Sequence, residues 1–141
     1  MKRKDIILSI ALSALLMTSC AKEKQPQVEL PDLASLFVSQ NFGDREVTSV
    51  SNDSASVYEV MLADKTEIEF NADGMWQKIK TDDAGSVPSK VLPMLAVSYL
   101  EDIYTGKKIK MVERNIPTGL MRVTLDDGLQ IVFTSEGQVA Q

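Results

Sequence analysis

The sequence predicts an α+β domain with two layers, built as a tandem repeat of one helix followed by three to four antiparallel strands. Three observations support this prediction. Two segments that begin with Leu-Pro have helical periodicity, apolar positions recur at a nearly constant offset, and several short segments alternate apolar and polar residues. We expect one sheet of about seven or eight strands, with both helices on one face.

The N-terminus has the features of a signal peptide, which we assign to residues 1–19. A basic start at residues 2–4 precedes an apolar run, residues 6–17, that is too short to span a bilayer. The segment Leu15-Leu16-Met17-Thr18-Ser19-Cys20 resembles the lipobox of bacterial lipoproteins, which implies cleavage before Cys20 and lipid attachment to its sulfur. An unmodified thiol near an ordinary cleavage site is the alternative. We expect a lipid-anchored protein of the cell envelope, at the outer membrane on its periplasmic or surface face.

The remaining chain divides into a tether and one domain. Residues 20–29 are polar, contain a proline and lack an apolar period, as a flexible tether does. The domain spans residues 30–141, with repeat 1 at about 30–80 and repeat 2 at about 87–141. Because Cys20 is the only cysteine, this domain has no disulfide to support it. The signal peptide holds three basic residues and one acidic residue, so its removal changes the formal net charge from −5 to −7, which argues against nucleic acid as a partner.

The two repeats match over most of their length. Their helix starts, aromatic residues and first apolar strand positions agree at an offset of 62 residues: Leu30, Pro31, Leu33, Ala34, Phe37, Phe42, Val47 and Val50 match Leu92, Pro93, Leu95, Ala96, Tyr99, Tyr104, Ile109 and Val112. After one inserted residue the offset becomes 63, and Tyr58, Val60, Leu62, Ile68, Phe70 and Gly74 match Met121, Val123, Leu125, Ile131, Phe133 and Gly137. This regularity indicates a duplication.

Each repeat is expected to open with a helix. Proline suits the first helical position, so Pro31 and Pro93 are predicted as the starts. Val87-Pro88-Ser89 leaves two alternatives open, an earlier start of the second helix or a short turn before it. The second helix is expected to bury Leu92, Leu95, Ala96, Tyr99 and Ile103, which share one helical face.

Alternating strands follow each helix. Residues 58–62 and 67–70 in repeat 1, and 121–125 and 130–133 in repeat 2, have period 2. The hairpin turn of repeat 2 contains Asp-Gly, whereas repeat 1 has Lys65 in place of Gly128, which predicts another turn type or a small strain. A fourth strand at 75–80 has only a short counterpart at 138–141. Trp76, the only tryptophan, is expected to pack at the sheet edge or under the tether and not to stack on a ligand.

The sequence offers few groups for chemistry. It has no histidine, no Gly-x-Ser-x-Gly turn and no glycine-rich phosphate loop. Asn71-x-Asp73-Gly74 matches a fragment of a calcium loop, but the terminal glutamate is missing, so we interpret it as a turn, with weak calcium binding as the alternative. We expect no enzymatic activity, no metal and no cofactor.

Residues 58–76, with the Leu-Pro helix starts, resemble PepSY-like lipoprotein domains, which are duplicated and similar in fold to beta-lactamase inhibitor proteins. The resemblance covers residues 30–141. It implies a sheet whose open face grips a partner protein, and PepSY-type domains have been proposed to restrain peptidases outside the cytoplasm. The chain departs from the inhibitors because its domain has no disulfide, and no residues match their target-contacting loops. Inhibition of a lactamase is therefore not expected.

The candidate partner-binding surface is the sheet face opposite the helices. Its predicted residues are Glu59, Met61, Glu67, Glu69, Arg122, Thr124, Gln130 and Val132. Repeat 1 supplies the more acidic half of this face. We expect a non-enzymatic module that binds an envelope protein. The alternatives are a component that binds a glycan, peptide or small ligand for uptake or sensing, and a structural spacer.

Overall fold

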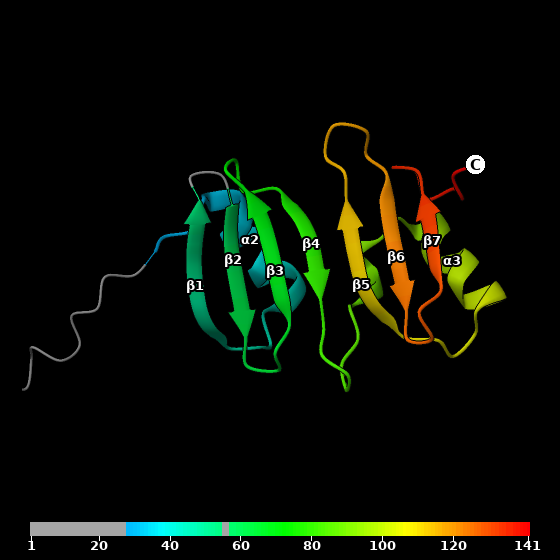
Figure 1. Cartoon of the computed structure of the whole chain (residues 1–141), viewed down its shortest axis with the longest axis horizontal. Coiled ribbons are helices and arrows are strands. Elements are labelled where there is room, and N and C mark those ends of the chain that lie inside the picture. The colour runs from blue at the N-terminus through cyan, green and yellow to red at the C-terminus, as the bar shows by residue number, and fades with distance from the viewer. Residues whose placement is uncertain (1–27, 55–56) are drawn as a thin grey trace, which may run out of the picture.

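The computed structural model describes residues 28–54 and 57–141 and has the predicted α+β class (Figure 1). The elements run in the order α2 (Asp32–Phe42), β1 (Val47–Ser54), β2 (Val57–Leu62), β3 (Glu67–Asn71), β4 (Trp76–Lys80), the 3₁₀ turn η1 (Ser89–Val91), α3 (Met94–Ile103), β5 (Ile109–Arg114), β6 (Met121–Leu125) and β7 (Gln130–Phe133). The strands form one seven-stranded antiparallel sheet in chain order. Cys20 and the predicted cleavage site lie outside the described residues.

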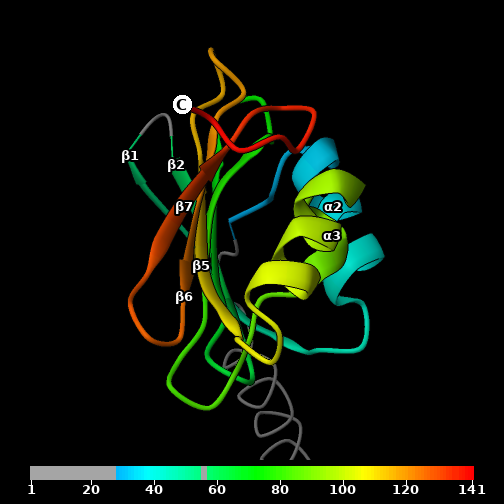
Figure 2. The ribbon, with the colours of Figure 1, turned by 90° about the vertical axis from the view of Figure 1, so that its right-hand side faces the viewer.

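Both helices cover the same face of the sheet, as Figure 2 shows edge-on. Within the described residues, neither helix has the length and apolar composition needed to cross a membrane. The core lies between the two layers, where Phe42, Phe70 and Phe133 are fully buried. The predicted two-layer arrangement with both helices on one face is therefore confirmed.

The duplication is visible in the packing of aromatic rings. In the first unit, the ring of Phe37 lies 6.2 Å from that of Phe42 and 5.9 Å, edge-on, from that of Phe70. In the second unit, Tyr99 lies 6.1 Å from Tyr104 and 5.8 Å, edge-on, from Phe133. Edge-on contacts place the positive edge of one ring against the negative face of another. The matched positions of the sequence thus make the same contacts in both units.

Each helix starts against a turn that follows the third strand of its own unit. A Cβ on Gly74 would lie 3.0 Å from the backbone nitrogen of Ala34, and one on Gly137 would lie 2.8 Å from that of Ala96. Both glycines also have positive φ, 88° and 95°. Because Ala34 and Ala96 are fully buried, glycine is the residue that lets the turn and the helix meet. The repeated acid-Gly pairs are structural.

The helix starts differ from the prediction by one residue. Pro31 and Pro93 have extended ψ values of 151° and 149° and stand just before the first helical residue. Their carbonyl oxygens accept the first helical hydrogen bonds, from Ser35 and Val97, which is the role of an N-cap residue. η1 precedes α3 as a separate turn, which decides between the two alternatives for residues 87–89.

The predicted buried face of α3 was partly wrong. Leu95 and Ile103 are 55% and 57% exposed, whereas Leu92, Ala96 and Leu100 are buried. The sheet covers only a narrow strip of α3, which is formed by residues four positions apart. Residues on either side of this strip remain exposed to solvent.

Trp76 does not lie at a sheet edge. It is 6% exposed in β4, the middle strand, and stacks on Phe37 with 5.8 Å between ring centroids. The predicted position at the sheet edge is therefore wrong, and Trp76 belongs to the core. Its counterpart at the end of the chain, Val139, forms a single bridge with Phe133, so the fourth strand of the second unit is short, as predicted.

The turn between β2 and β3 and the turn that follows β3 have distinct local structures. Lys65 has a positive φ of 69°, so it keeps the turn conformation that Gly128 has in the second unit, at a cost of about 1 kcal/mol. In the other turn, the side-chain oxygen of Asn71 accepts hydrogen bonds from the backbone nitrogens of Asp73 and Met75. These bonds give the Asn71–Asp73 segment the geometry of an Asx turn.

We predict that Gly137→Ala destabilises the fold by about 1 kcal/mol or more beyond Gly128→Ala. Gly128 has a similar φ of 88°, but no atom lies within 4 Å of a Cβ built on it, so it serves as a control for backbone strain alone. Urea unfolding of the two variants measures the difference. Equal losses would show that the contact between turn and helix start contributes nothing.

Candidate functional site

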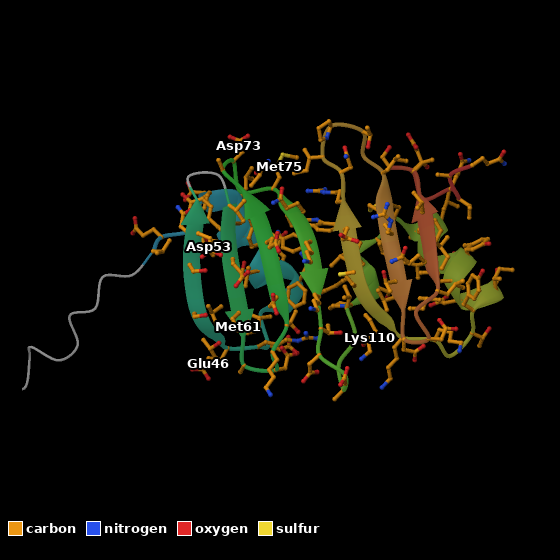
Figure 3. All side chains as sticks on the ribbon, in the orientation of Figure 1. Glu46, Asp53, Met61, Asp73, Met75 and Lys110 are labelled. Carbon is orange, nitrogen blue, oxygen red and sulfur yellow. The ribbon has the colours of Figure 1, made fainter. Side chains whose placement is uncertain are left out.

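The strand register arranges side chains of the open face in two rows across the strands, and Met61 of one row is labelled in Figure 3. The strand register aligns the first row as Ser51, Glu59, Glu69, Lys78, Glu113, Arg122 and Val132. The second row is Ser49, Met61, Glu67, Lys80, Met111, Thr124 and Gln130. All eight residues predicted for this face lie in these rows, and none is in the buried core.

Six members of the rows escaped the prediction: Ser49 and Ser51 in β1, Lys78 and Lys80 in β4, and Met111 and Glu113 in β5. The register shifts between Glu69 and Phe70 opposite β4, and between Ile109 and Met111 in β5, so these strands lack a strict period of 2. The core residues Trp76 and Ile79 are consequently three positions apart, as are Ile109 and Val112. The lysines on either side of buried Ile79 were the sequence signal that could have placed Lys78 and Lys80 on the open face.

Ion pairs organise the first row. The Lys78 ammonium lies 3.6 Å from a Glu69 carboxylate oxygen, and the Arg122 guanidinium lies 3.7 Å from a Glu113 oxygen. Lys78 and Lys80 therefore offset part of the acidity expected for the first unit. The acidic part of the face is confined to β2 and β3, where Glu59, Glu67 and Glu69 are close together.

Glu59 is the residue most affected by this crowding. Burial raises the pKa of its carboxyl group, and the nearby charges of Glu67, Asp53 and Glu69 raise it further, against a smaller effect of Lys78. Ionised Glu59 thus stores repulsion that an approaching cation would relieve.

The centre of the open face is hollowed. A depression of about 540 Å³ lies over β4, β5 and β6, with Glu69, Lys78, Glu113 and Arg122 around it. Val132 and Leu120 add apolar surface to the same depression. The lining is mainly polar and charged, with these two apolar side chains among it. Charged groups of both signs can fix the orientation of a bound protein.

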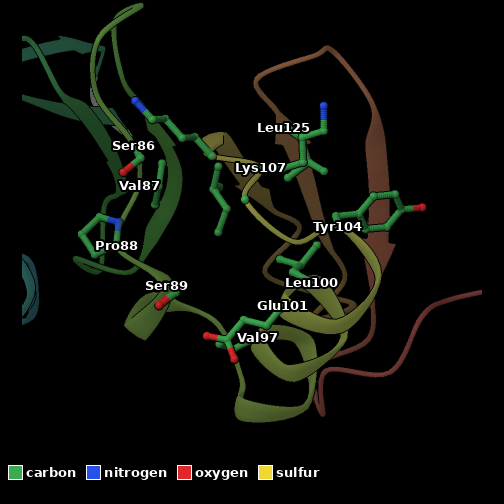
Figure 4. Close-up of a pocket in the computed structure, with 13 residues that line it drawn as sticks. Ser86, Val87, Pro88, Ser89, Val97, Leu100, Glu101, Tyr104, Lys107 and Leu125 are labelled. Carbon is green, nitrogen blue, oxygen red and sulfur yellow. The ribbon is translucent and has the colours of Figure 1, made fainter.

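A second hollow lies on the helix side, between the linker that follows β4 and helix α3 (Figure 4). Its volume is about 300 Å³. Buried Val87, Leu100 and Leu125 form its apolar walls, and the hydroxyl group of Tyr104 points away from it. The pocket is therefore suited to an apolar group.

The described residues do not contain a metal-binding cluster of three or more acidic, histidine or cysteine side chains. Two loop acids, Asp82 and Asp127, serve the backbone or an ion pair. Asp82 accepts hydrogen bonds from the backbone nitrogens of Ala84 and Gly85, and Asp127 pairs with Lys107 at 3.2 Å. The open face has the features of a binding surface.

Residues 56–141 match the family model described as "Putative beta-lactamase-inhibitor-like, PepSY-like". The chain belongs to this PepSY-like family. The match confirms the resemblance seen in the sequence, and the two helix-and-strand units of the fold agree with its duplicated character. Curated proteins yielded no match.

Solved structures similar to this PepSY-like chain come from Bacteroides. One, from Bacteroides vulgatus, is described as a "putative periplasmic protein of unknown function"; it is 31% identical, with a TM-score of 0.67, over 80% of this chain and 90% of that chain. Another, from Bacteroides thetaiotaomicron, is described as a "putative calcium-regulated periplasmic protein", with 24% identity, a TM-score of 0.69 and coverages of 80% and 89%. A third, also from Bacteroides vulgatus, has 23% identity, a TM-score of 0.68 and coverages of 85% and 97%. None of these descriptions names an enzymatic activity.

We predict that Glu59→Gln raises the free energy of unfolding at pH 7 by about 0.5 kcal/mol, because it removes a carboxylate that the fold disfavours. Because the pKa of Glu59 is higher in the folded than in the unfolded state, protonation of its carboxylate stabilises the fold. This stabilisation is fully present below the pKa of the unfolded chain and is lost as pH rises through the pKa of the folded state. The gain in unfolding free energy from Glu59→Gln should therefore vanish at pH 3. Thermal unfolding at pH 7 and at pH 3 would show this.

Glu136→Gln is the matched control. Hydrogen bonds to its own backbone nitrogen and to the hydroxyl groups of Thr134 and Ser135 lower the pKa of Glu136, so its carboxylate is favoured in the fold. This variant should bring no gain at pH 7. A gain from Glu59→Gln that persists at pH 3 would contradict the electrostatic explanation.

Proposed function

We propose that this chain is a non-catalytic, lipid-anchored module of the cell envelope that binds a partner protein through its open sheet face. The observation that carries the proposal is the unbroken pair of side-chain rows across the sheet. No element of residues 28–54 and 57–141 covers these rows, because both helices lie on the other face (Figure 2). Cys20 supplies the anchor, and the partner is an extracytoplasmic enzyme, such as a peptidase, that the module restrains.

Charge supports a basic patch on the partner. The acidic corner made by Glu59, Glu67 and Glu69 lies beside the central depression, and burial together with the neighbouring acidic charges raises the pKa of Glu59. A lysine or arginine of the partner would relieve the repulsion among these acidic groups on binding. Complementary charge of this kind contributes to specificity and to the rate of association.

A small-ligand role is the second candidate. The pocket of about 300 Å³ between the linker and α3 supports it, because apolar walls with a polar rim are typical of small-molecule sites. The two candidates use opposite layers of the molecule, so variants of the open face separate them.

We predict that Glu67→Lys and Glu69→Lys together abolish capture of the partner from its own envelope fraction while melting changes little. Each side chain is partly exposed, and surface ion pairs such as Lys78 with Glu69 contribute about 1 kcal/mol or less. The readout is the set of proteins retained on immobilised protein, compared between variants by mass spectrometry.

Glu101→Lys with Asp102→Lys is the control, because it reverses the same charge on exposed residues of α3, in the other layer. The control should retain the proteins that the open-face variant loses. Retention of the same proteins by both variants would exclude the acidic corner as the binding site.

A further inference from the structure

Another pocket, distinct from the central depression and from the hollow beside α3, lies between the two units. It is at the end of the sheet where β4 begins and β5 ends. Its volume is about 270 Å³. Its lining is mainly apolar and is formed by Met75 from the first unit, Val91 at the end of η1 and Leu92 after it, and Ile116 and Met121 from the second unit. One charged side chain, that of Arg114, lines the same space.

Arg114 is held in a fixed position by Trp76. Its Nε donates a hydrogen bond of 3.0 Å to the backbone oxygen of Trp76, and its guanidinium carbon lies 4.4 Å from the centre of the indole ring. Phe37 also packs on the indole, in a stacked arrangement. The guanidinium therefore stays in place without a ligand, which lowers the entropy lost when a ligand binds.

Arg114 differs from the other described arginines in its partners. Arg45 lies 2.9 Å from a carboxylate oxygen of Asp64, and Arg122 lies 3.7 Å from one of Glu113. No carboxylate of residues 28–54 and 57–141 forms an ion pair with Arg114. Burial also lowers its pKa, which shows that the site withdraws the cation from water without supplying an anion.

We propose that this pocket binds a carboxylate carried on a small apolar group, such as the C-terminal residue of a peptide with an aliphatic side chain. Because Nε already donates to Trp76, the terminal nitrogens of Arg114 provide the donors for the carboxylate. The apolar lining takes the attached side chain. Small-molecule pockets usually measure roughly 300–1,000 Å³, so a volume just below this range limits the buried part to about one residue.

The site is separate from the acidic corner of the open face. Arg114 lines both the pocket and the central depression, where Glu69 and Glu113 are paired with Lys78 and Arg122 and not with Arg114. The remaining lining of the pocket contains none of Glu59, Glu67 and Glu69.

The test is an NMR titration that follows the indole N–H of Trp76, the only tryptophan of the chain. The probes are N-acetyl-leucine and 4-methylpentanoate, each compared with its own amide. We expect both acids to give saturable shifts, with each amide about tenfold weaker or worse, because charge-assisted hydrogen bonds are lost. Binding of N-acetyl-leucine alone would identify a peptide end as the ligand, and binding of both acids would identify the carboxylate and the apolar group as sufficient.

Arg114→Gln should abolish the preference for the acids, and Arg45→Gln, which changes an arginine that already has a carboxylate partner outside the pocket, should keep it. Equal binding of acid and amide, or no saturable shift with any probe, would overturn the proposal. An acid preference that survives in Arg114→Gln would overturn it as well. If Arg114→Gln does not fold, the comparison of acid with amide in the unaltered protein decides.

Discussion

The pairing of β4 with β5 is the constraint on which the rest of the structure depends. The first unit contributes α2 and strands β1 to β4, the second contributes α3 and strands β5 to β7, and this pairing makes the two units share one sheet. Its register sets Lys78 opposite Glu113, Ile79 opposite Val112 and Lys80 opposite Met111. The same pairing continues the rows of the open face and brings Arg114 over Trp76. Both proposed binding sites thus rely on the junction.

The linker between the units is tied to this junction by the side chain of Lys110 and by backbone hydrogen bonds of Thr81 and Val87 to Lys110 and Ile109. The ammonium group of Lys110, in β5, donates hydrogen bonds to the backbone oxygens of Asp82, Asp83 and Gly85. One cation therefore satisfies three carbonyl groups of a loop that has few partners of its own. The register of β5 and the course of the linker are fixed together.

The duplicated residues maintain the fold, and the residues that differ between the units create the surfaces. Gly74 and Gly137 make the same contact with a helix start, and the aromatic groups repeat with nearly the same distances. In contrast, Arg114 stands where the first unit has Asn52, Lys110 where it has Thr48, and Val132 where it has Glu69. The two units therefore share a backbone fold but differ in their surface side chains, and these differences give the molecule two kinds of site.

Much of this could be predicted from the sequence, for identifiable physical reasons. Alternation placed Glu59, Met61, Glu67 and Glu69 on the open face, because β2 and β3 keep a strict period of 2. It failed in β4 and β5, where irregular pairing moves one residue out of phase and hides Lys78 and Glu113. Helical spacing alone could not exclude Leu95 from the core, because the sheet covers only part of the apolar face of α3.

The pocket at Arg114 could not be predicted from the sequence, for a different reason. It forms only where the β4–β5 pairing brings the two units together, and no local pattern marks Arg114 as a residue without a carboxylate. The hydrogen bond from its Nε to Trp76 joins residues 38 positions apart in the chain. Contacts of this range depend on topology and not on periodicity.

Site-specific photo-crosslinking in the native envelope tests the central claim most directly. A photoreactive residue in place of Met61, on the open face, is compared with one in place of Leu36, which is 50% exposed on α2. If the open face binds the partner protein, a discrete crosslinked product should form from position 61 and not from position 36. A product from position 36 alone would place the partner on the helical layer and contradict the account.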